Sequence, residues 1–231
     1  MGGRTALGLF LLVLVAVGSG VADSNFTLTG AGPNNLGGVY VAPYTGQLAS
    51  GVSSALGTGT LTLICDDYFD DVSVWQQWNV QVTAFSSGDL SNTIYSSGTT
   101  YNNFGPGTTN PATTAADFYK ELFYLIDQMN LSSTDSTVLQ KNADLNWAIW
   151  ELADPGLVLG TSDQSTIAGY ASAAEANYNL VTNADDFYII SPSPTDKGAE
   201  GQEYITYVPE PSSLALFGSG LLTLLWRRKL C

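Results

Sequence analysis

Hydrophobic and polar positions alternate with a period of two in the first half of the chain, and this alternation predicts β-strands. One face of the segment 61–65 is apolar and consists of Leu61, Leu63 and Cys65. The next apolar run repeats the pattern with Val80, Val82 and Ala84. The other residues from 23 to about 113 are rich in Gly, Ser, Thr and Asn, which favour turns and loops. The segment 97–113, with Gly105-Pro106-Gly107, is typical of a loop. We therefore expect short strands here.

The middle of the chain changes to a helical period. Thr114 with Asp117 three residues later resembles a helix-capping box. The first apolar stripe after it consists of Phe118, Leu122, Leu125, Ile126 and Met129. A second helix is indicated by Leu145, Ala148, Ile149 and Leu152, and a third by Ile167, Tyr170, Ala171 and Ala174. Asp154-Pro155-Gly156 should end the second helix.

Two short strands are expected after the helices, near Phe187–Ser191 and Glu203–Val208. Strands, then helices, then strands again predict an α+β fold. We expect an antiparallel β-sandwich-like body over residues 23–207, with an inserted helical block at about 114–180. The segments 1–22 and 208–231 flank this body and are predicted to be targeting signals.

Residues 1–22 have the features of a secretory signal peptide. Arg4 precedes a nearly unbroken apolar run from Leu7 to Val17, and Gly20-Val21-Ala22 ends in small residues. We expect cleavage after Ala22. The alternative is an uncleaved membrane anchor, although the apolar run is short for a membrane span.

The C-terminus combines three features in a fixed order. The segment Val208-Pro209-Glu210-Pro211 comes first, an apolar run from Leu214 to Trp226 follows, and a basic tip closes it with Arg227, Arg228 and Lys229. This tail resembles the PEP-CTERM sorting domain of Gram-negative bacteria. The resemblance implies recognition and cleavage at the Pro-Glu-Pro motif by an exosortase, a membrane protease-transpeptidase. The alternative is a core helix at the end of a soluble domain.

The apolar run at the C-terminus is short for a transmembrane helix. Its 13 residues reach roughly 20 Å as a helix, against a hydrocarbon core of about 30 Å. Snorkelling Arg and Lys side chains extend that reach. The basic tip should stay in the cytoplasm and leave the acidic body outside. We therefore expect a short transmembrane helix that anchors the chain in the inner membrane before processing.

Charge excludes several classes of function. Residues 23–207 contain 20 acidic and 3 basic residues, a formal charge of −17. Such a surface repels phosphate backbones, so we expect no nucleic-acid binding. The chain contains no histidine, which excludes Ser-His-Asp and Cys-His catalysis and every His-ligated metal site. We expect no cofactor.

The cysteines suggest one candidate site. Cys231 would leave with the tail, so the exported body keeps Cys65 alone. Cys65 on its strand and Asn146-Trp147-Ala148-Ile149-Trp150 on a helix resemble the Cys-Gln thioester domains of bacterial surface adhesins. That family bonds a strand cysteine to the glutamine of a Gln-x-Ala-Ile-Trp motif and captures amines. Here Asn146 stands at the glutamine position, so Cys65 and Asn146 are the candidate thioester-like pair. The alternative is an inert buried thiol.

A dense acidic cluster follows Cys65 and consists of Asp66, Asp67, Asp70 and Asp71. Carboxylate oxygens at this density are candidate ligands for Ca²⁺, but their spacing is not that of an EF-hand loop. The competing interpretation is a solvated acidic loop. Nearby aromatic residues, among them Tyr68, Phe69, Trp75 and Trp78, are candidates either for stacking on sugars or for the core.

These features predict a non-enzymatic protein that is exported, processed at its C-terminus and associated with the cell surface or extracellular matrix. The expected partners are an exosortase-like membrane protease and, outside the cell, a polysaccharide or other surface ligand. Two alternatives remain open. One is an adhesin that forms a covalent link through Cys65, and the other is a carbohydrate-binding or carbohydrate-active protein.

Overall fold

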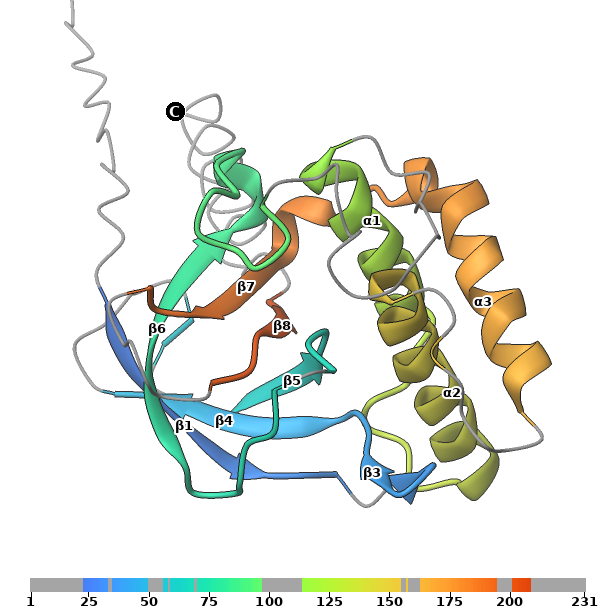
Figure 1. The fold of residues 1–231 in the computed structure, drawn as a ribbon, viewed down its shortest axis with the longest axis horizontal. Helices are drawn as coiled ribbons and strands as arrows, with labels where there is room; N and C mark the ends of the chain where they lie inside the picture. The colour runs from blue at the N-terminus through green and yellow to red at the C-terminus, as the bar shows by residue number, and fades with distance from the viewer. Residues whose placement is uncertain are drawn as a thin grey trace, which may run out of the picture.

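Six antiparallel strands form a closed barrel in the order β1–β4–β5–β8–β7–β6 (Figure 1). The computed structural model describes residues 23–32, 35–49, 56–57, 59–68, 70–96, 114–154, 157, 163–194 and 201–208. The barrel strands are β1 (Ser24–Gly30), β4 (Tyr44–Leu48), β5 (Leu61–Cys65), β6 (Gln77–Ala84), β7 (Phe187–Pro192) and β8 (Tyr204–Tyr207). A separate hairpin, β2 (Asn35–Leu36) and β3 (Val39–Tyr40), lies between β1 and β4 in the chain.

The expected α+β class with antiparallel strands is confirmed, but the sheet is a barrel rather than a sandwich. Strand β1 closes it, because Phe26 is opposite Leu48 of β4 on one side and opposite Trp78 of β6 on the other. The register of β1 shifts between Leu28 and Gly30. Such a bulge bends a strand and increases its twist, which helps a sheet to curl onto itself.

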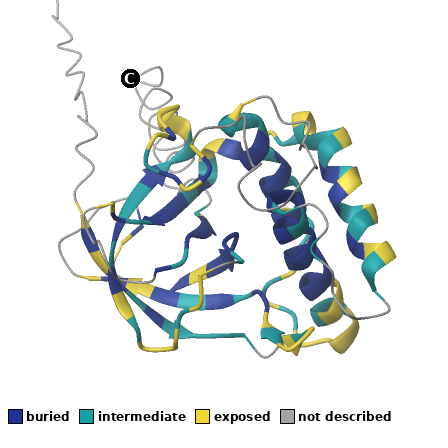
Figure 2. Cartoon of the chain, viewed as in Figure 1, coloured by how far each residue is buried: buried dark blue, intermediate teal, exposed yellow. Residues whose placement is uncertain are grey.

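Three helices are inserted between β6 and β7, as predicted. They are α1 (Ala115–Ile126), α2 (Ser136–Ala153) and α3 (Gln164–Asn177), and the short 3₁₀ turns are η1 (Phe85–Ser87), η3 (Tyr178–Leu180) and η4 (Ala184–Asp186). The Thr114 hydroxyl caps α1 by accepting the Asp117 N–H at 3.1 Å. The helices stand beside the barrel, with α1 and α2 more deeply buried than α3 (Figures 1 and 2).

Aromatic side chains fill both the barrel and its contact with the helices. Inside the barrel, the Phe26 and Trp78 rings meet edge to face with centroids 4.9 Å apart. Gly46 makes room for them, since a Cβ there would lie 2.3 Å from the Phe26 ring. Between barrel and helices, Phe123 of α1 stacks on Phe187 of β7 at 4.1 Å. The contact between Phe123 and Phe187 fixes the helical block against β7.

The predicted strands β5 and β6 are present, but the alternation of buried and exposed positions changes along β6. Leu61, Leu63 and Cys65 are buried as expected, but Ile64 between them is also fully buried, because the end of β5 is covered on both faces. In β6, Val80 is buried as expected, but Val82 and Ala84 are only half-buried, because the buried position moves to Thr83. The predicted turn at 97–113, the signal peptide and the transmembrane tail lie outside the described residues. Among the described residues, no helix is both long and apolar enough to span a membrane.

Candidate functional site

Cys65 lies at the end of β5, where the barrel meets helix α2. It is fully buried as a free thiol, and its Sγ–H donates to the Asp67 carbonyl oxygen at 3.0 Å. Burial raises the pKa of the Cys65 thiol well above its usual value, and the negative charges of Asp67 and Asp66 raise it further. The backbone at Asp67 and the Trp150 indole oppose this rise. The thiol is therefore protonated at neutral pH and is a poor nucleophile.

Asn146 of α2 lies beside Cys65, as predicted from the sequence. Its Nδ2 donates to the Cys65 carbonyl oxygen at 3.0 Å, and its Oδ1 accepts the Ala42 N–H at 2.7 Å. All three residues are fully buried. The amide therefore joins helix α2 to strand β5 and to the segment before β4, three parts of the chain that are distant in sequence.

This geometry gives Asn146 a structural role in the described fold. Both polar atoms of its amide bind backbone groups, so neither the amide nitrogen nor the amide oxygen is buried without a hydrogen bond. The candidate pair of Cys65 and Asn146 is thus brought together. Formation of a thioester between them stays a prediction, which the intact mass of the exported protein tests.

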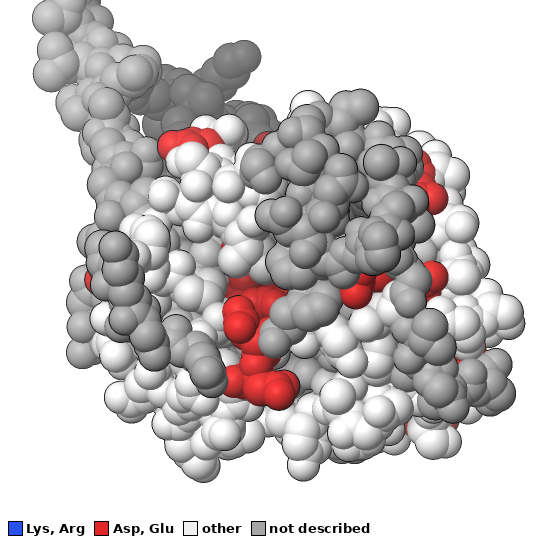
Figure 3. Space-filling view, viewed as in Figure 1, with Lys and Arg blue, Asp and Glu red and all other residues white. Residues whose placement is uncertain are grey.

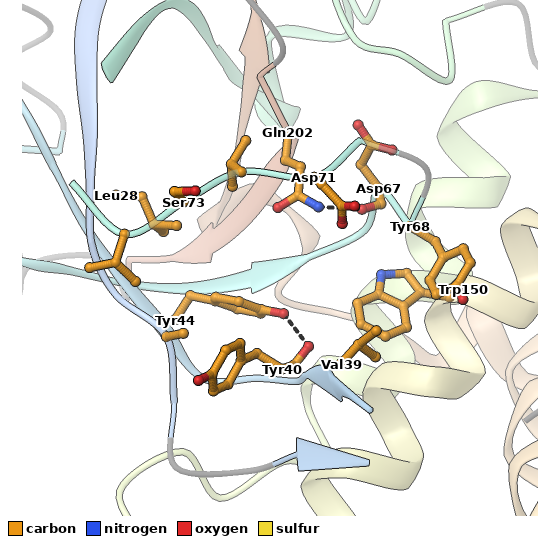
Figure 4. Close-up of a pocket in the computed structure, with 13 residues that line it drawn as sticks. Leu28, Val39, Tyr40, Tyr44, Asp67, Tyr68, Asp71, Ser73, Trp150 and Gln202 are labelled. Atoms are coloured by element: carbon orange, nitrogen blue, oxygen red, sulfur yellow. Dashed lines mark hydrogen bonds between the residues drawn. The ribbon is translucent and has the colours of Figure 1, made fainter. Parts of the chain in front are cut away.

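A pocket of about 320 Å³ opens next to this junction. Its aromatic wall consists of Tyr40, Tyr44, Tyr68 and Trp150 (Figure 4), its aliphatic wall of Leu28, Ala31, Val39, Val72 and Val74, and its polar residues are Asp67, Asp71, Ser73 and Gln202. Within the aromatic wall, Tyr68 packs on Trp150 with ring centroids 5.3 Å apart. Tyr68 also packs on Trp147, which does not line the pocket, at 5.5 Å. Rings with few, fixed polar groups are typical of small-ligand sites.

The hairpin β2–β3 brings Val39 and Tyr40 to the pocket. Its turn residues Gly37 and Gly38 have φ of 68° and 91°, and two successive positive φ angles are what a tight two-residue hairpin turn requires. Helix α2 fixes the hairpin through the Trp147 Nε1–H, which donates to the Leu36 carbonyl oxygen at 3.3 Å. The Tyr44 hydroxyl donates to the Tyr40 carbonyl oxygen, as Figure 4 shows.

Gln202 fixes the opposite wall of the pocket. Its Nε2 donates to the Asp67 carbonyl oxygen at 3.2 Å and to the Asp70 carbonyl oxygen, while its Oε1 accepts the Tyr204 hydroxyl at 2.9 Å. The loop from 66 to 76 is also anchored to β1, because the Trp75 N–H donates to the Leu28 carbonyl oxygen at 2.7 Å. Both sides of the pocket are thus held by hydrogen bonds to the barrel.

The acidic cluster does not behave as a solvated loop throughout. Asp66 and Asp67 are 0% and 5% exposed, whereas Asp70 and Asp71 are exposed. The expectation of a solvated loop is therefore wrong for the first two. Among the described residues, no group of three or more acidic or cysteine side chains could hold a metal ion, so the Ca²⁺ alternative gains no support.

Asp66 instead meets Glu203 from the segment before β8. Burial raises the pKa of the Asp66 carboxyl well above its usual value, and the charge of Glu203 and a hydrogen bond with it add to the rise. Burial also raises the pKa of Glu203, against hydrogen bonds from Ser191, Tyr119 and the Ile94 N–H. The Tyr119 hydroxyl donates to Glu203 Oε1 at 2.5 Å and the Ile94 N–H to Oε2 at 2.9 Å. Two buried carboxyl groups in contact cannot both be ionised at low cost, so the pair shares a proton.

The nearby aromatic residues divide between core and surface. Trp78 is in the barrel core, Tyr68 lines the pocket and Phe69 lies outside the described residues. Trp75 is 70% exposed. Sequence reasoning thus found Cys65, Asn146 and the aromatic group, but it missed Tyr40, Glu203 and Gln202. A tyrosine beside a Gly-Gly turn and a Gln-Glu pair before a strand give no local signal of a shared site.

Comparison with known proteins identifies the C-terminal tail. The family model of the PEP-CTERM protein-sorting motif matches residues 208–229. No curated protein and no solved structure matches the chain, and the resemblance to Cys-Gln thioester domains gains no support from these comparisons. This motif implies that the chain is exported and sorted by an exosortase.

Proposed function

We propose that this exported protein is a non-catalytic surface protein whose barrel binds a glycan in the pocket beside α2. The observation that carries the proposal is the pocket itself, about 320 Å³ in volume and walled by four aromatic rings with Asp67, Asp71 and Gln202 among its polar residues. Aromatic faces pack against the apolar faces of sugar rings, and carboxylate and amide groups bind sugar hydroxyls.

The Trp150 indole supports the same function. Trp150 is 2% exposed and lines the pocket, and a hydrogen bond from its side chain lowers the pKa of the Cys65 thiol. This contact and its packing on Tyr68, with ring centroids 5.3 Å apart, hold the ring in place. Figure 4 shows the indole ring among the residues that line the pocket. A ring held in this way offers a fixed face on which a sugar can pack.

The buried carboxyl pair of Asp66 and Glu203 is not placed to hydrolyse a glycan in the pocket. A glycosidase needs two carboxyl groups about 5 to 9.5 Å apart, on either side of the scissile bond. Asp66 and Glu203 are fully buried, lie against each other and do not line the pocket. We expect no release of reducing sugar from any glycan that binds.

Replacing Tyr40 by alanine tests the pocket. Tyr40 is 58% exposed, so the variant should fold normally, but it loses an aromatic wall of the site. We expect glycan affinity to fall about tenfold or more, the effect typical of a central aromatic contact. A glycan array followed by calorimetry with the tightest oligosaccharide measures this. The control is Tyr207→Ala, an exposed tyrosine on β8 outside the pocket. Equal binding by both variants and the parent protein would remove the pocket from the account.

Replacing Pro209-Glu210-Pro211 by three alanines tests the processing. The motif precedes the apolar run, so its loss should leave the tail uncleaved and the chain held in the membrane fraction. Cell fractionation with detection of the body and the tail measures this outcome. A control with Ser212 and Ser213 replaced by alanine should be processed normally. Unchanged processing of the triple-alanine variant would exclude the motif as the recognition element.

Intact mass tests the alternative of a covalent adhesin. A thioester between Cys65 and Asn146 would remove one ammonia, about 17 Da, from the exported protein. We expect the full mass, because burial raises the pKa of the thiol and keeps it protonated. A thiol reagent should label Cys65 only after unfolding. A mass deficit of one ammonia, together with labelling by small amines, would establish the adhesin instead.

A further inference from the structure

Trp75 combines two unfavourable features at the rim of the pocket. It is the only residue other than glycine with a positive φ among the described residues, at 75°, a conformation in which the Cβ of an L-residue is crowded. It is also 70% exposed, so packing against the protein does not offset that cost. Glycine would suit this backbone position better.

The position of Trp75 connects it to the pocket. Val74, its neighbour in the chain, lines the pocket and is 40% exposed. The Trp75 N–H donates at 2.7 Å to the carbonyl oxygen of Leu28, another lining residue. Val74 and the 58% exposed Tyr40 line the pocket, and the exposed Trp75 follows Val74 in the chain; these three residues are called the rim below.

Charge restricts what this rim can bind. The body has a formal charge of −17, and Asp70 and Asp71 are exposed in the same loop. On the face drawn in Figure 3, Asp and Glu atoms gather near the centre and no Lys or Arg atom is visible among the described residues. An acidic polysaccharide would be repelled here, whereas a neutral or amino-bearing one would not.

From these observations we infer that Trp75 is a second sugar subsite, and that the ligand is a non-acidic polysaccharide chain rather than a monosaccharide. This inference rests on the proposed function, since the pocket holds one part of the chain and the Trp75 indole stacks on a neighbouring sugar. The strained backbone at residue 75 serves to present a large ring to solvent, where a glycine could not. Strain held at an exposed site is typical of functional positions.

The test uses the full chain in mild detergent and three neutral or amino-bearing series, namely cello-, manno- and chito-oligosaccharides of two to six sugars. Alginate oligosaccharides of the same lengths serve as the acidic series. We expect affinity to rise with length in at least one of the first three series and no binding of alginate. Trp75→Gly and Trp75→Ala should both weaken binding of the hexasaccharide about tenfold, with less than a twofold effect on the disaccharide.

Thermal unfolding separates the role of the ring from that of the backbone. Trp75→Gly relieves the positive φ and should raise the unfolding temperature by about 2 to 4 °C, whereas Trp75→Ala keeps the crowded Cβ and should not. A glycan that binds with equal affinity to the parent and both variants, or with no dependence on length, overturns the second subsite and leaves the pocket standing. Preferred binding of alginate overturns the inferred ligand class. Failure of all four series to bind overturns the proposed function itself.

Discussion

Replacing Asn146 by leucine should lower the free energy of unfolding by about 3 kcal/mol, because two buried backbone groups then lose their partner. The Asn146 side chain accepts the Ala42 N–H at 2.7 Å and donates to the Cys65 carbonyl oxygen at 3.0 Å. Leucine has a similar volume, so the loss reports the hydrogen bonds rather than a cavity. Urea denaturation followed by tryptophan fluorescence gives the free energy.

Asn142 offers a matched control on the same helix. It is also fully buried, and its amide also makes two backbone hydrogen bonds, but both go to Asn130 in the turn between α1 and α2. Asn142→Leu should destabilise that turn and leave Cys65 protected. Only Asn146→Leu should also increase the rate at which Cys65 reacts with a thiol reagent under native conditions. Equal reactivity in both variants would contradict the account of Asn146 as the link between α2 and the barrel.

Replacing Asp66 by asparagine should stabilise the protein at pH 8 and change little at pH 4. Burial and Glu203 raise the pKa of Asp66 in the folded state, whereas the pKa of an aspartate in the unfolded chain is about 3.9. The folded state therefore binds more protons, and stability falls as the pH rises from about 4 towards the raised pKa. Asparagine carries no charge and can still donate a hydrogen bond to Glu203. Urea denaturation across this pH range measures the difference between parent and variant.

Asp89→Asn controls for net charge, because it also removes one negative charge. Asp89 is fully exposed, and hydrogen bonds from Ser91 lower the pKa of its carboxyl. Its contribution thus has the opposite sign, since it stabilises the protein above its unfolded pKa and is lost as the pH falls. A similar gain at pH 8 in both variants would mean that relief of overall repulsion explains the effect. The burial of Asp66 beside Glu203 would then have no special role.

The elements of this fold follow from local signals, whereas their closure into a barrel does not. The apolar stripes of the three helices predicted α1, α2 and α3 near their observed positions. The pairing of Thr114 with Asp117 correctly predicted the N-terminal cap of α1. Alternation predicted the inward face of β5. Alternation cannot show which strand edges pair, however, and the pairing of β1 with both β4 and β6 distinguishes a barrel from a sandwich.

The candidate site was predictable only where its residues lie on recognisable elements. Cys65 at the end of a strand and Asn146 on an apolar helix came together as expected. The acidic neighbours of Asp66 in the sequence predict a solvated position, but Asp66 is buried against Glu203, which comes from a distant part of the chain. The pocket likewise depends on the β2–β3 hairpin and Gln202 lying on opposite sides of one loop, which local composition does not reveal.

The most direct test of the central claim is a crystal structure of the protein with the oligosaccharide that it binds most tightly. The account predicts a sugar ring in the pocket, packed between the hairpin residue Tyr40 and the Trp150 indole. Electron density for the glycan on another surface, with the pocket empty at saturating ligand, would contradict it.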